Sequence, residues 1–199
     1  MLWRSFLIRF VALALVVFVS ACQTAYKDGQ PNEDSPYYEV PIDSKLILHR
    51  DLTIPAKTAI VYLQRGQIFL KHYQYNRYAT YCELELSRKR DVPQTIEADE
   101  FLIYKVKQER VFGDGGFIQL ASRGVFGGVA RIMRDNGGKQ LYEVVATRMA
   151  LRSERQPDVQ ALICASWHSA QAMSYLTIRK IRDTLGDIFS LQLAQGAPG

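Results

Sequence analysis

Residues 81–86 alternate strictly between the two faces of an extended chain, and this alternation constrains the fold more than any other stretch. The two faces would carry Cys82, Leu84 and Leu86 on one side and Tyr81, Glu83 and Glu85 on the other. A period of two with acidic residues on one face is typical of an antiparallel strand that is buried on one side and solvated on the other. We therefore expect Cys82 to face the core and Glu83 and Glu85 to face water.

Other short runs of apolar and β-branched residues are separated by turn signals. The clearest runs are residues 45–49, 58–64, 67–72, 101–111, 141–151 and 160–167. Arg65-Gly66 is a turn signal between two of them, which predicts a hairpin over residues 58–72. The glycine-rich stretch 113–138 lacks the strand-to-helix context of a phosphate-binding loop, so its glycines indicate turns and bulges instead.

One helix is predicted near the end of the chain. Thr177 can cap its start and Gly186 can end it. The stripe between them that would face the core consists of Ile178, Ile181, Thr184 and Leu185. With about eight or nine short strands around this helix, we expect a mainly β fold, either an antiparallel β-sandwich or an open barrel with one C-terminal helix.

The first residues have the parts of an export signal. Arg4 and Arg9 precede the apolar run Phe10–Val19, and the chain turns polar directly after Cys22. The alternative is a membrane-spanning anchor, but the apolar run is well short of the roughly 20 residues that span a bilayer. Under either interpretation the two arginines hold the start of the chain in the cytoplasm and place the globular part outside it.

The four residues Val19-Ser20-Ala21-Cys22 resemble the lipobox of bacterial lipoproteins. The resemblance implies that diacylglycerol is added to the Cys22 sulfur, that the chain is cleaved before Cys22, and that the new amino terminus is acylated. Gln23, where inner-membrane lipoproteins carry Asp, resembles an outer-membrane sorting signal. We therefore expect the protein to be anchored by its lipid to the periplasmic face of the outer membrane.

The composition divides the chain into a signal peptide over residues 1–21, a flexible tether over 22–43 and a single β-rich periplasmic domain over 44–195. The tether is rich in Pro, Gly, Asn, Asp and Ser and is expected not to order itself, giving a reach of about 25 Å. Loss of Arg4 and Arg9 with the signal lowers the formal net charge from +5 to +3. This mild excess gives no indication of a nucleic-acid partner.

Two cysteines remain once Cys22 carries lipid. In an oxidising periplasm, Cys82 and Cys164 are expected to form one structural disulfide, and the buried strand predicted over 160–167 would bring them together. The alternative is that one of them is a free nucleophilic thiol beside His49, His72 or His168.

The densest aromatic stretch of the chain lies between residues 72 and 81. Tyr and Arg are favoured at binding surfaces because they give a large contact area at low entropic cost. The predicted partner-binding residues are Tyr73, Tyr75, Arg77, Tyr78 and Tyr81. The alternative is a loop whose tyrosines cover the edge of the sheet with their hydroxyl groups in water.

Other kinds of site receive less support. Arg148, Arg152 and Arg155 together with Lys89 and Arg90 could gather phosphate, although surface arginines are common. The three histidines lie far apart in sequence without carboxylates at ligand spacing, so neither a metal site nor a cofactor is expected. No motif of a hydrolase appears, and no catalytic residue is predicted.

Residues 78–86 and 151–167 resemble pieces of an uncharacterised family of small proteobacterial lipoproteins. This resemblance supports the paired cysteines and implies no activity. We expect a binding or accessory domain that docks to an envelope protein or assembly. The alternatives are a carrier or sensor of a small amphiphile, such as a lipid or glycan held inside the barrel, and an envelope hydrolase.

Overall fold

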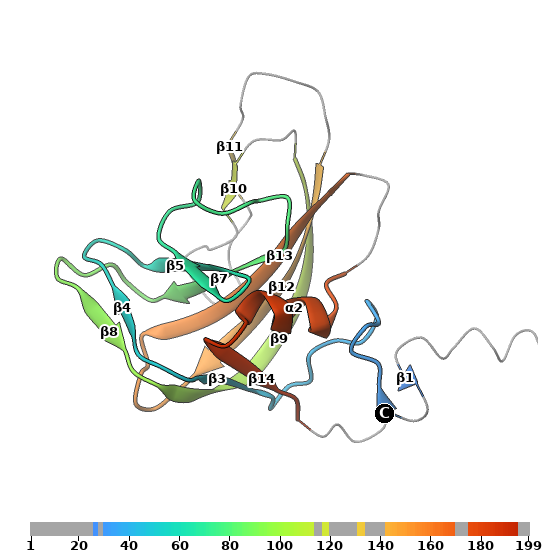
Figure 1. Ribbon diagram of the computed structural model, residues 1–199, viewed down its shortest axis with the longest axis horizontal. Helices are drawn as coiled ribbons and strands as arrows, with labels where there is room; N and C mark the ends of the chain where they lie inside the picture. The colour runs from blue at the N-terminus through green and yellow to red at the C-terminus, as the bar shows by residue number, and fades with distance from the viewer. Residues whose placement is uncertain are drawn as a thin grey trace, which may run out of the picture.

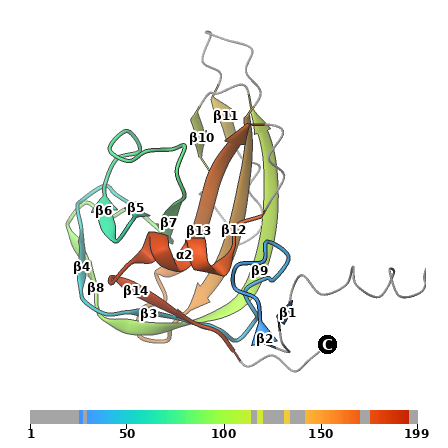
Figure 2. The ribbon, with the colours of Figure 1, turned by 45° about the vertical axis from the view of Figure 1, so that its right-hand side comes forward.

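The computed structural model describes residues 26–27, 30–113, 117–119, 131–133, 142–169 and 175–194. Its centre is an eight-stranded antiparallel sheet with the strand order β14-β3-β9-β12-β13-β7-β5-β6. These strands are β3 (Lys45–Leu48), β5 (Ile60–Gln64), β6 (Gln67–Phe69), β7 (Tyr81–Leu86), β9 (Asp99–Gly113), β12 (Tyr142–Arg152), β13 (Val159–Ser169) and β14 (Phe189–Gln192). The sheet curls into a half-barrel around the helix α2 (Ile178–Leu185) (Figures 1 and 2).

Three pairs of short antiparallel strands accompany the central sheet. They are β1 (Tyr26–Lys27) with β2 (Gln30–Pro31), β4 (Leu52–Ile54) with β8 (Gln94–Ile96), and β10 (Phe117–Gln119) with β11 (Arg131–Met133). The prediction of a mainly β chain with one C-terminal helix is therefore confirmed. The prediction allowed a β-sandwich or an open barrel. The structure is an open barrel, because one curled sheet surrounds the core and, among the described residues, no second sheet packs against it face to face.

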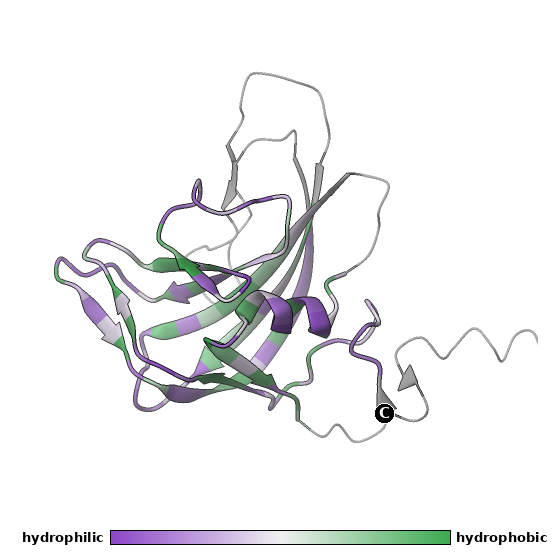
Figure 3. Cartoon of the chain, in the orientation of Figure 1, coloured by the Kyte–Doolittle hydropathy of each residue, from purple (hydrophilic) through white to green (hydrophobic). Residues whose placement is uncertain are grey.

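The inner face of the half-barrel is filled by apolar side chains and by α2. The helix contacts β14 near one edge of the sheet and β5 and β7 near the other. Its buried residues are Ile178, Ile181, Thr184 and Leu185, which is the stripe that the sequence predicts. Figure 3 shows the hydropathy of the residues along these strands. In β3 and β14 every second residue is buried in this core, namely Leu46 and Leu48, and Phe189 and Leu191.

The two ends of α2 follow the predicted capping. Thr177 accepts a hydrogen bond from the backbone N–H of Lys180, and Gly186 ends the helix with a φ of 60°. The predicted β5–β6 hairpin turns at Arg65 and Gly66, whose φ angles of 52° and 71° are those of the left-handed turns that suit tight hairpins. The two glycines meet, since a Cβ atom added to Gly186 would lie 2.5 Å from the Gly66 Cα.

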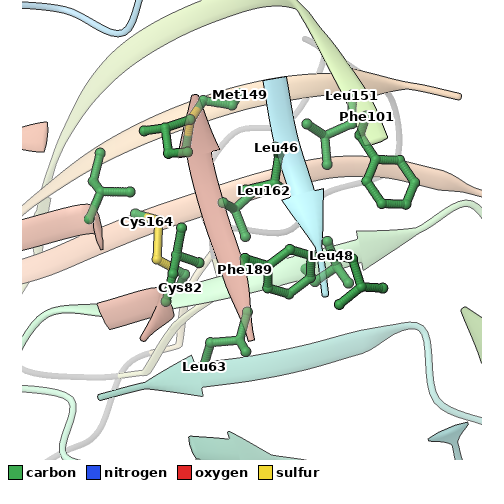
Figure 4. Close-up of a cluster of buried hydrophobic side chains, with 14 of the residues drawn as sticks. Leu46, Leu48, Leu63, Cys82, Phe101, Met149, Leu151, Leu162, Cys164 and Phe189 are labelled. Atoms are coloured by element: carbon green, nitrogen blue, oxygen red, sulfur yellow. A yellow bond between two sulfur atoms is a disulfide. The ribbon is translucent and has the colours of Figure 1, made fainter. Parts of the chain in front are cut away.

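Cys82 and Cys164 are direct cross-strand neighbours in β7 and β13. Their sulfur atoms lie 2.06 Å apart, at disulfide-bonding distance, and both side chains are buried on the inner face beside Leu63 and Leu162 (Figure 4). The sequence places Cys82 on the core side, and the structure agrees. With both sulfurs joined, neither cysteine is the free thiol that the nucleophile alternative requires.

The expectation that the second face of β7 is solvated is wrong. Tyr81, Glu83 and Glu85 are all buried, and Glu83 is only 1% exposed. The reason lies in the neighbouring strands, because a second apolar cluster covers the outer face of the sheet. Its buried members are Tyr81, Val144, Ala146, Ala161, Ile163, Ala165 and Trp167.

The tether prediction is wrong for residues 32–43, which form a strap on the domain. Tyr38 and Val40 lie in the main core cluster. Asp34 pairs with Arg179 at the start of α2, and the Arg179 N–H donates to the Glu33 carbonyl oxygen at 3.2 Å. Residues 32–43 are therefore part of the packed domain. The predicted signal peptide and the lipidation site Cys22 lie outside the described residues.

Within the ranges given above, no helix is both long enough and apolar enough to cross a bilayer.

Replacing either cysteine should lower the free energy of unfolding as much as replacing both, because each replacement removes the same disulfide. Cys82→Ser, Cys164→Ser and the double variant should each lose up to about 4 kcal/mol of unfolding free energy, because each reopens a loop of 82 residues in the unfolded chain. Denaturant unfolding of the oxidised chains and cellular abundance measure this loss. A single variant that stays stable would contradict a structural role for the pair.

The strap can be tested with two adjacent tyrosines. Tyr38 is 8% exposed and Tyr37 is 67% exposed. Tyr38→Ala should therefore destabilise the protein by about 3 kcal/mol through loss of core packing, whereas Tyr37→Ala should change stability by less than about 0.5 kcal/mol. Equal effects of the two substitutions in thermal unfolding would show that the strap is not part of the cooperative domain.

Candidate functional site

The segment between β6 and β7, residues 70–80, contains most of the predicted partner-binding residues and is called the aromatic loop below. The structure divides the five predicted residues into two groups. Tyr73 and Tyr78 are 68% and 57% exposed. Tyr75 and Tyr81 instead turn toward the outer face of the sheet, and the Arg77 guanidinium lies 5.8 Å from the Trp167 ring centroid.

Tyr75 attaches the aromatic loop to the sheet. Its ring stacks on Tyr62 of β5 at a centroid distance of 5.0 Å and lies 4.6 Å from the ring of Tyr81. Burial raises the pKa of Tyr62, Tyr75 and Tyr81 far above the ordinary tyrosine value, and the buried Glu83 carboxylate raises it further. The three hydroxyl groups therefore stay protonated, and Tyr75 donates a hydrogen bond to Tyr81.

Gln64, at the end of β5, fixes the backbone of the aromatic loop. Its Nε2 donates to the carbonyl oxygens of Asn76 and Thr80 at 2.8 and 3.1 Å, and its Oε1 accepts from the Asn76 N–H at 3.1 Å. This side chain is buried, so water competes weakly for these bonds. The loop is thus held in one conformation by a side chain that was not among the predicted site residues.

Gln74 closes the outer edge of the hairpin. Its Oε1 accepts hydrogen bonds from the backbone N–H groups of Leu70 and Lys71, at 3.2 and 3.0 Å. These N–H groups follow β6, the edge strand of the sheet, and they are no longer available to an added strand. The backbone N–H groups of the two residues directly after β6 are therefore closed to a partner.

Exposed apolar side chains gather in β6 and the aromatic loop. Large hydrophobic residues that are exposed in this segment are Ile68, Leu70, Tyr73 and Tyr78. Elsewhere in the part of the chain that the structure describes, the exposed ones are Tyr37 and Ile42 in the strap over residues 32–43 and Val92 between β7 and β8. The segment therefore combines exposed apolar area with a fixed backbone, which is the combination that docking surfaces use.

The alternative interpretation, in which the tyrosines cover the edge of the sheet, applies to part of the aromatic loop. Tyr75 and Tyr81 do cover the sheet, but desolvation raises the pKa of both hydroxyl groups, which is not expected of hydroxyl groups surrounded by water. For docking this leaves the exposed Tyr73 and Tyr78 with the half-buried Arg77, because the half-buried Tyr75 packs its ring against Tyr62 and Tyr81.

Sequence reasoning missed the polar centre of the outer face. Arg148 reaches across β13 to Glu85, with Nη1 and Oε2 3.0 Å apart, and both side chains are almost fully buried. Burial raises the pKa of Glu85 more than the Arg148 charge lowers it. The continuous apolar run over 160–167 was a usable signal, because a strand buried on both faces leaves its neighbours little access to water.

The predicted phosphate site does not form as a cluster of free cations. Its members were Arg148, Arg152, Arg155, Lys89 and Arg90. Arg148 is buried with Glu85, Arg155 pairs with Glu97 at 2.9 Å, and Arg90 pairs with Asp158. Hydrogen bonds from Ser87 and Arg90 lower the pKa of Asp158, which keeps this partner negatively charged.

An open groove of about 380 Å³ lies beside the turn between β12 and β13. The charged and amide side chains along it include Arg88, Arg90, Gln94, Arg155, Gln156 and Asp158. Gln156 Nε2 donates to the Glu97 carbonyl oxygen at 2.9 Å, and Asp158 accepts from Ser87 at 2.7 Å. These contacts stabilise the end of the sheet, so the polar side chains along the groove already have a structural role.

The two histidines whose side chains the structure describes do not lie in one site. His49 and His72 are exposed on separate loops, and His72 contacts the ring of Tyr73. Among the residues that the structure describes, no three His, Cys, Asp or Glu side chains come close enough to hold a metal ion.

Comparison with protein-family models, with curated proteins and with solved structures found no match to this chain.

The buried pair predicts a pH-dependent defect. Arg148→Met should destabilise the protein by about 3–5 kcal/mol at neutral pH, because it leaves the Glu85 carboxylate buried without its cation. The pKa of Glu85, already raised in the folded protein, would rise further above its unfolded value. Stability should then fall as pH rises through that interval and recover on acidification.

Denaturant unfolding at acidic and neutral pH measures the effect. The double variant Glu85→Gln with Arg148→Met serves as the control, since it removes the charge and should restore part of the stability at neutral pH. A defect of Arg148→Met that is equal at both pH values would contradict the assignment.

Proposed function

We propose that this chain is a lipid-anchored domain of the bacterial envelope that works by docking to an envelope protein or assembly. The lipobox residues Val19-Ser20-Ala21-Cys22 support lipidation of Cys22, and Gln23 supports an address on the periplasmic face of the outer membrane. The aromatic loop would be the docking surface, with Tyr73, Arg77 and Tyr78 in contact with the partner.

The observation that carries the docking role is the fixed exposure of Tyr73 and Tyr78. Exposed tyrosines on a mobile loop would lose conformational entropy on binding, and this loss weakens association. Here Tyr75 and Gln64 hold the loop before any partner arrives. The conformational entropy of the loop is therefore lost during folding and not on binding.

The direction of the surface also supports docking away from the anchor. The strap over 32–43 contacts the start of α2, and the β5–β6 turn contacts its end, where the Gly66 N–H donates to the Thr184 carbonyl oxygen at 3.1 Å. The strap and the aromatic loop accordingly lie on different sides of the helix (Figures 1 and 2). A domain anchored through its amino terminus would turn the loop away from its own attachment point.

A carrier of a small amphiphile needs open space inside the barrel. In the described part of the chain the inner face is filled by the core side chains and α2, including Phe101, Met149 and Phe189 (Figure 4). The filled inner face therefore favours docking over a carrier.

Site-specific photo-cross-linking in cells tests the docking role. Replacing Tyr73 with p-benzoylphenylalanine in the full-length chain should give a defined polypeptide adduct. The same replacement at Tyr37 should not, although Tyr37 is equally exposed at 67%. Adding Tyr78→Ala should lower the Tyr73 adduct about tenfold, as expected for an anchor residue at an interface centre.

The Cys22→Ala form serves as the control for the anchor, and its adduct should decrease because the domain is no longer held at the membrane. Equal adducts from the two positions, or none from Tyr73 at normal abundance, would contradict docking through the aromatic loop.

A further inference from the structure

The stretch from Arg65 to Thr80 contains no acidic residue, although the chain has 20 of them. Its cations are Arg65 in the hairpin turn and Lys71 and Arg77 in the aromatic loop. Lys71 Nζ lies 5.6 Å from the ring centroid of Tyr73, beside the first exposed tyrosine. Arg77 lies over the ring of Trp167. The Trp167 ring is in turn 6.2 Å from the ring of Tyr78, the second exposed tyrosine. Each exposed tyrosine therefore has a cation next to it.

Several arginines elsewhere in the described chain are neutralised by carboxylates, unlike these cations. Arg90, Arg155 and Arg179 each pair with a carboxylate. Within the described ranges, the ion pairs do not include Arg65, Lys71 or Arg77.

Acidic groups near this segment do not neutralise its surface. Glu83 is buried beneath the tyrosines. Asp187 approaches the Gly66 turn, and its Oδ1 lies 3.9 Å from Arg50. The surface of the aromatic loop thus combines exposed apolar area with positive charge.

We infer that the partner presents an acidic protein surface, with carboxylates around an apolar contact. This inference rests on the proposed docking function and specifies its partner. Carboxylates beside Lys71 and Arg77 would complement their charge and speed association, while apolar side chains would cover Tyr73 and Tyr78.

The hydrogen-bonding groups of the loop argue against two other occupants. A glycan needs acceptors for its hydroxyl groups, but Gln74 Oε1 and Asn76 Oδ1 already accept backbone N–H groups of the loop. An added β-strand needs free backbone N–H groups next to β6, and Gln74 occupies those of Leu70 and Lys71. A folded protein surface requires neither.

The test uses the full-length lipidated chain with p-benzoylphenylalanine at Tyr73, cross-linked in cells. Lys71→Glu with Arg77→Glu should lower the adduct about tenfold, because like charges would then face each other across the contact. The matched control is Lys89→Glu with Lys180→Glu, which changes the net charge equally at exposed positions elsewhere and should leave the adduct unchanged.

Two further measurements complete the test. Because Arg77 packs on Trp167, Lys71→Glu alone is tested as well, and it should give a smaller decrease in the same direction. Mass spectrometry of the adduct should place the cross-link in a partner segment with net negative charge.

The outcomes separate the two proposals. If the adduct depends on Tyr78 but not on Lys71 and Arg77, or if the cross-linked segment is not acidic, the acidic partner is wrong and docking stands. If Tyr73 forms no adduct, or links only to lipid or glycan, both proposals are overturned.

Discussion

A half-barrel leaves its inner face open between its two edge strands, and the rest of this structure depends on how α2 fills that opening. The helix places its apolar stripe on the core and contacts strands near both edges. Its two ends then position the other parts. The strap binds at Arg179 near the start, and the β5–β6 hairpin meets Gly186 at the end, where a Cβ atom on residue 186 would collide with the Gly66 backbone. The helix thus links the amino-terminal side of the domain to the hairpin that begins the aromatic loop.

Burial on both faces of β7 and β13 explains why the aromatic loop is held on a fixed support. The inner face holds the cysteine pair, and the outer face holds Tyr81, Glu83 and the Glu85–Arg148 ion pair. Buried charges of this kind add little net stability, since desolvation offsets most of their attraction. Their contribution here is to shape the outer face, on which Tyr75 rests. The inward tyrosines hold the loop, and this lets Tyr73 and Tyr78 remain exposed in one conformation.

The strap changes how an anchored domain would be held. A tether that is flexible up to residue 43 would let the domain rotate freely around its attachment. Because residues 32–43 are packed on α2 and the core, they cannot act as a flexible part of the attachment. Proline- and acid-rich composition predicts a tether here, but it does not reveal Tyr38 and Val40 as core residues. Two apolar side chains are enough to order a segment when the core has room for them.

The sequence alone determined the local features of this protein. Periodicity predicted the strands and the face on which Cys82 lies, and capping residues predicted both ends of α2, because these depend only on near neighbours in the chain. The export signal and the lipobox are likewise local, and they still carry the expectation of an anchored envelope protein. Tertiary structure alone decided which tyrosines of residues 73–81 are exposed, where Arg148 finds its partner, and that residues 32–43 are ordered. The reason is physical: burial depends on what packs from distant parts of the chain, and no local pattern records that.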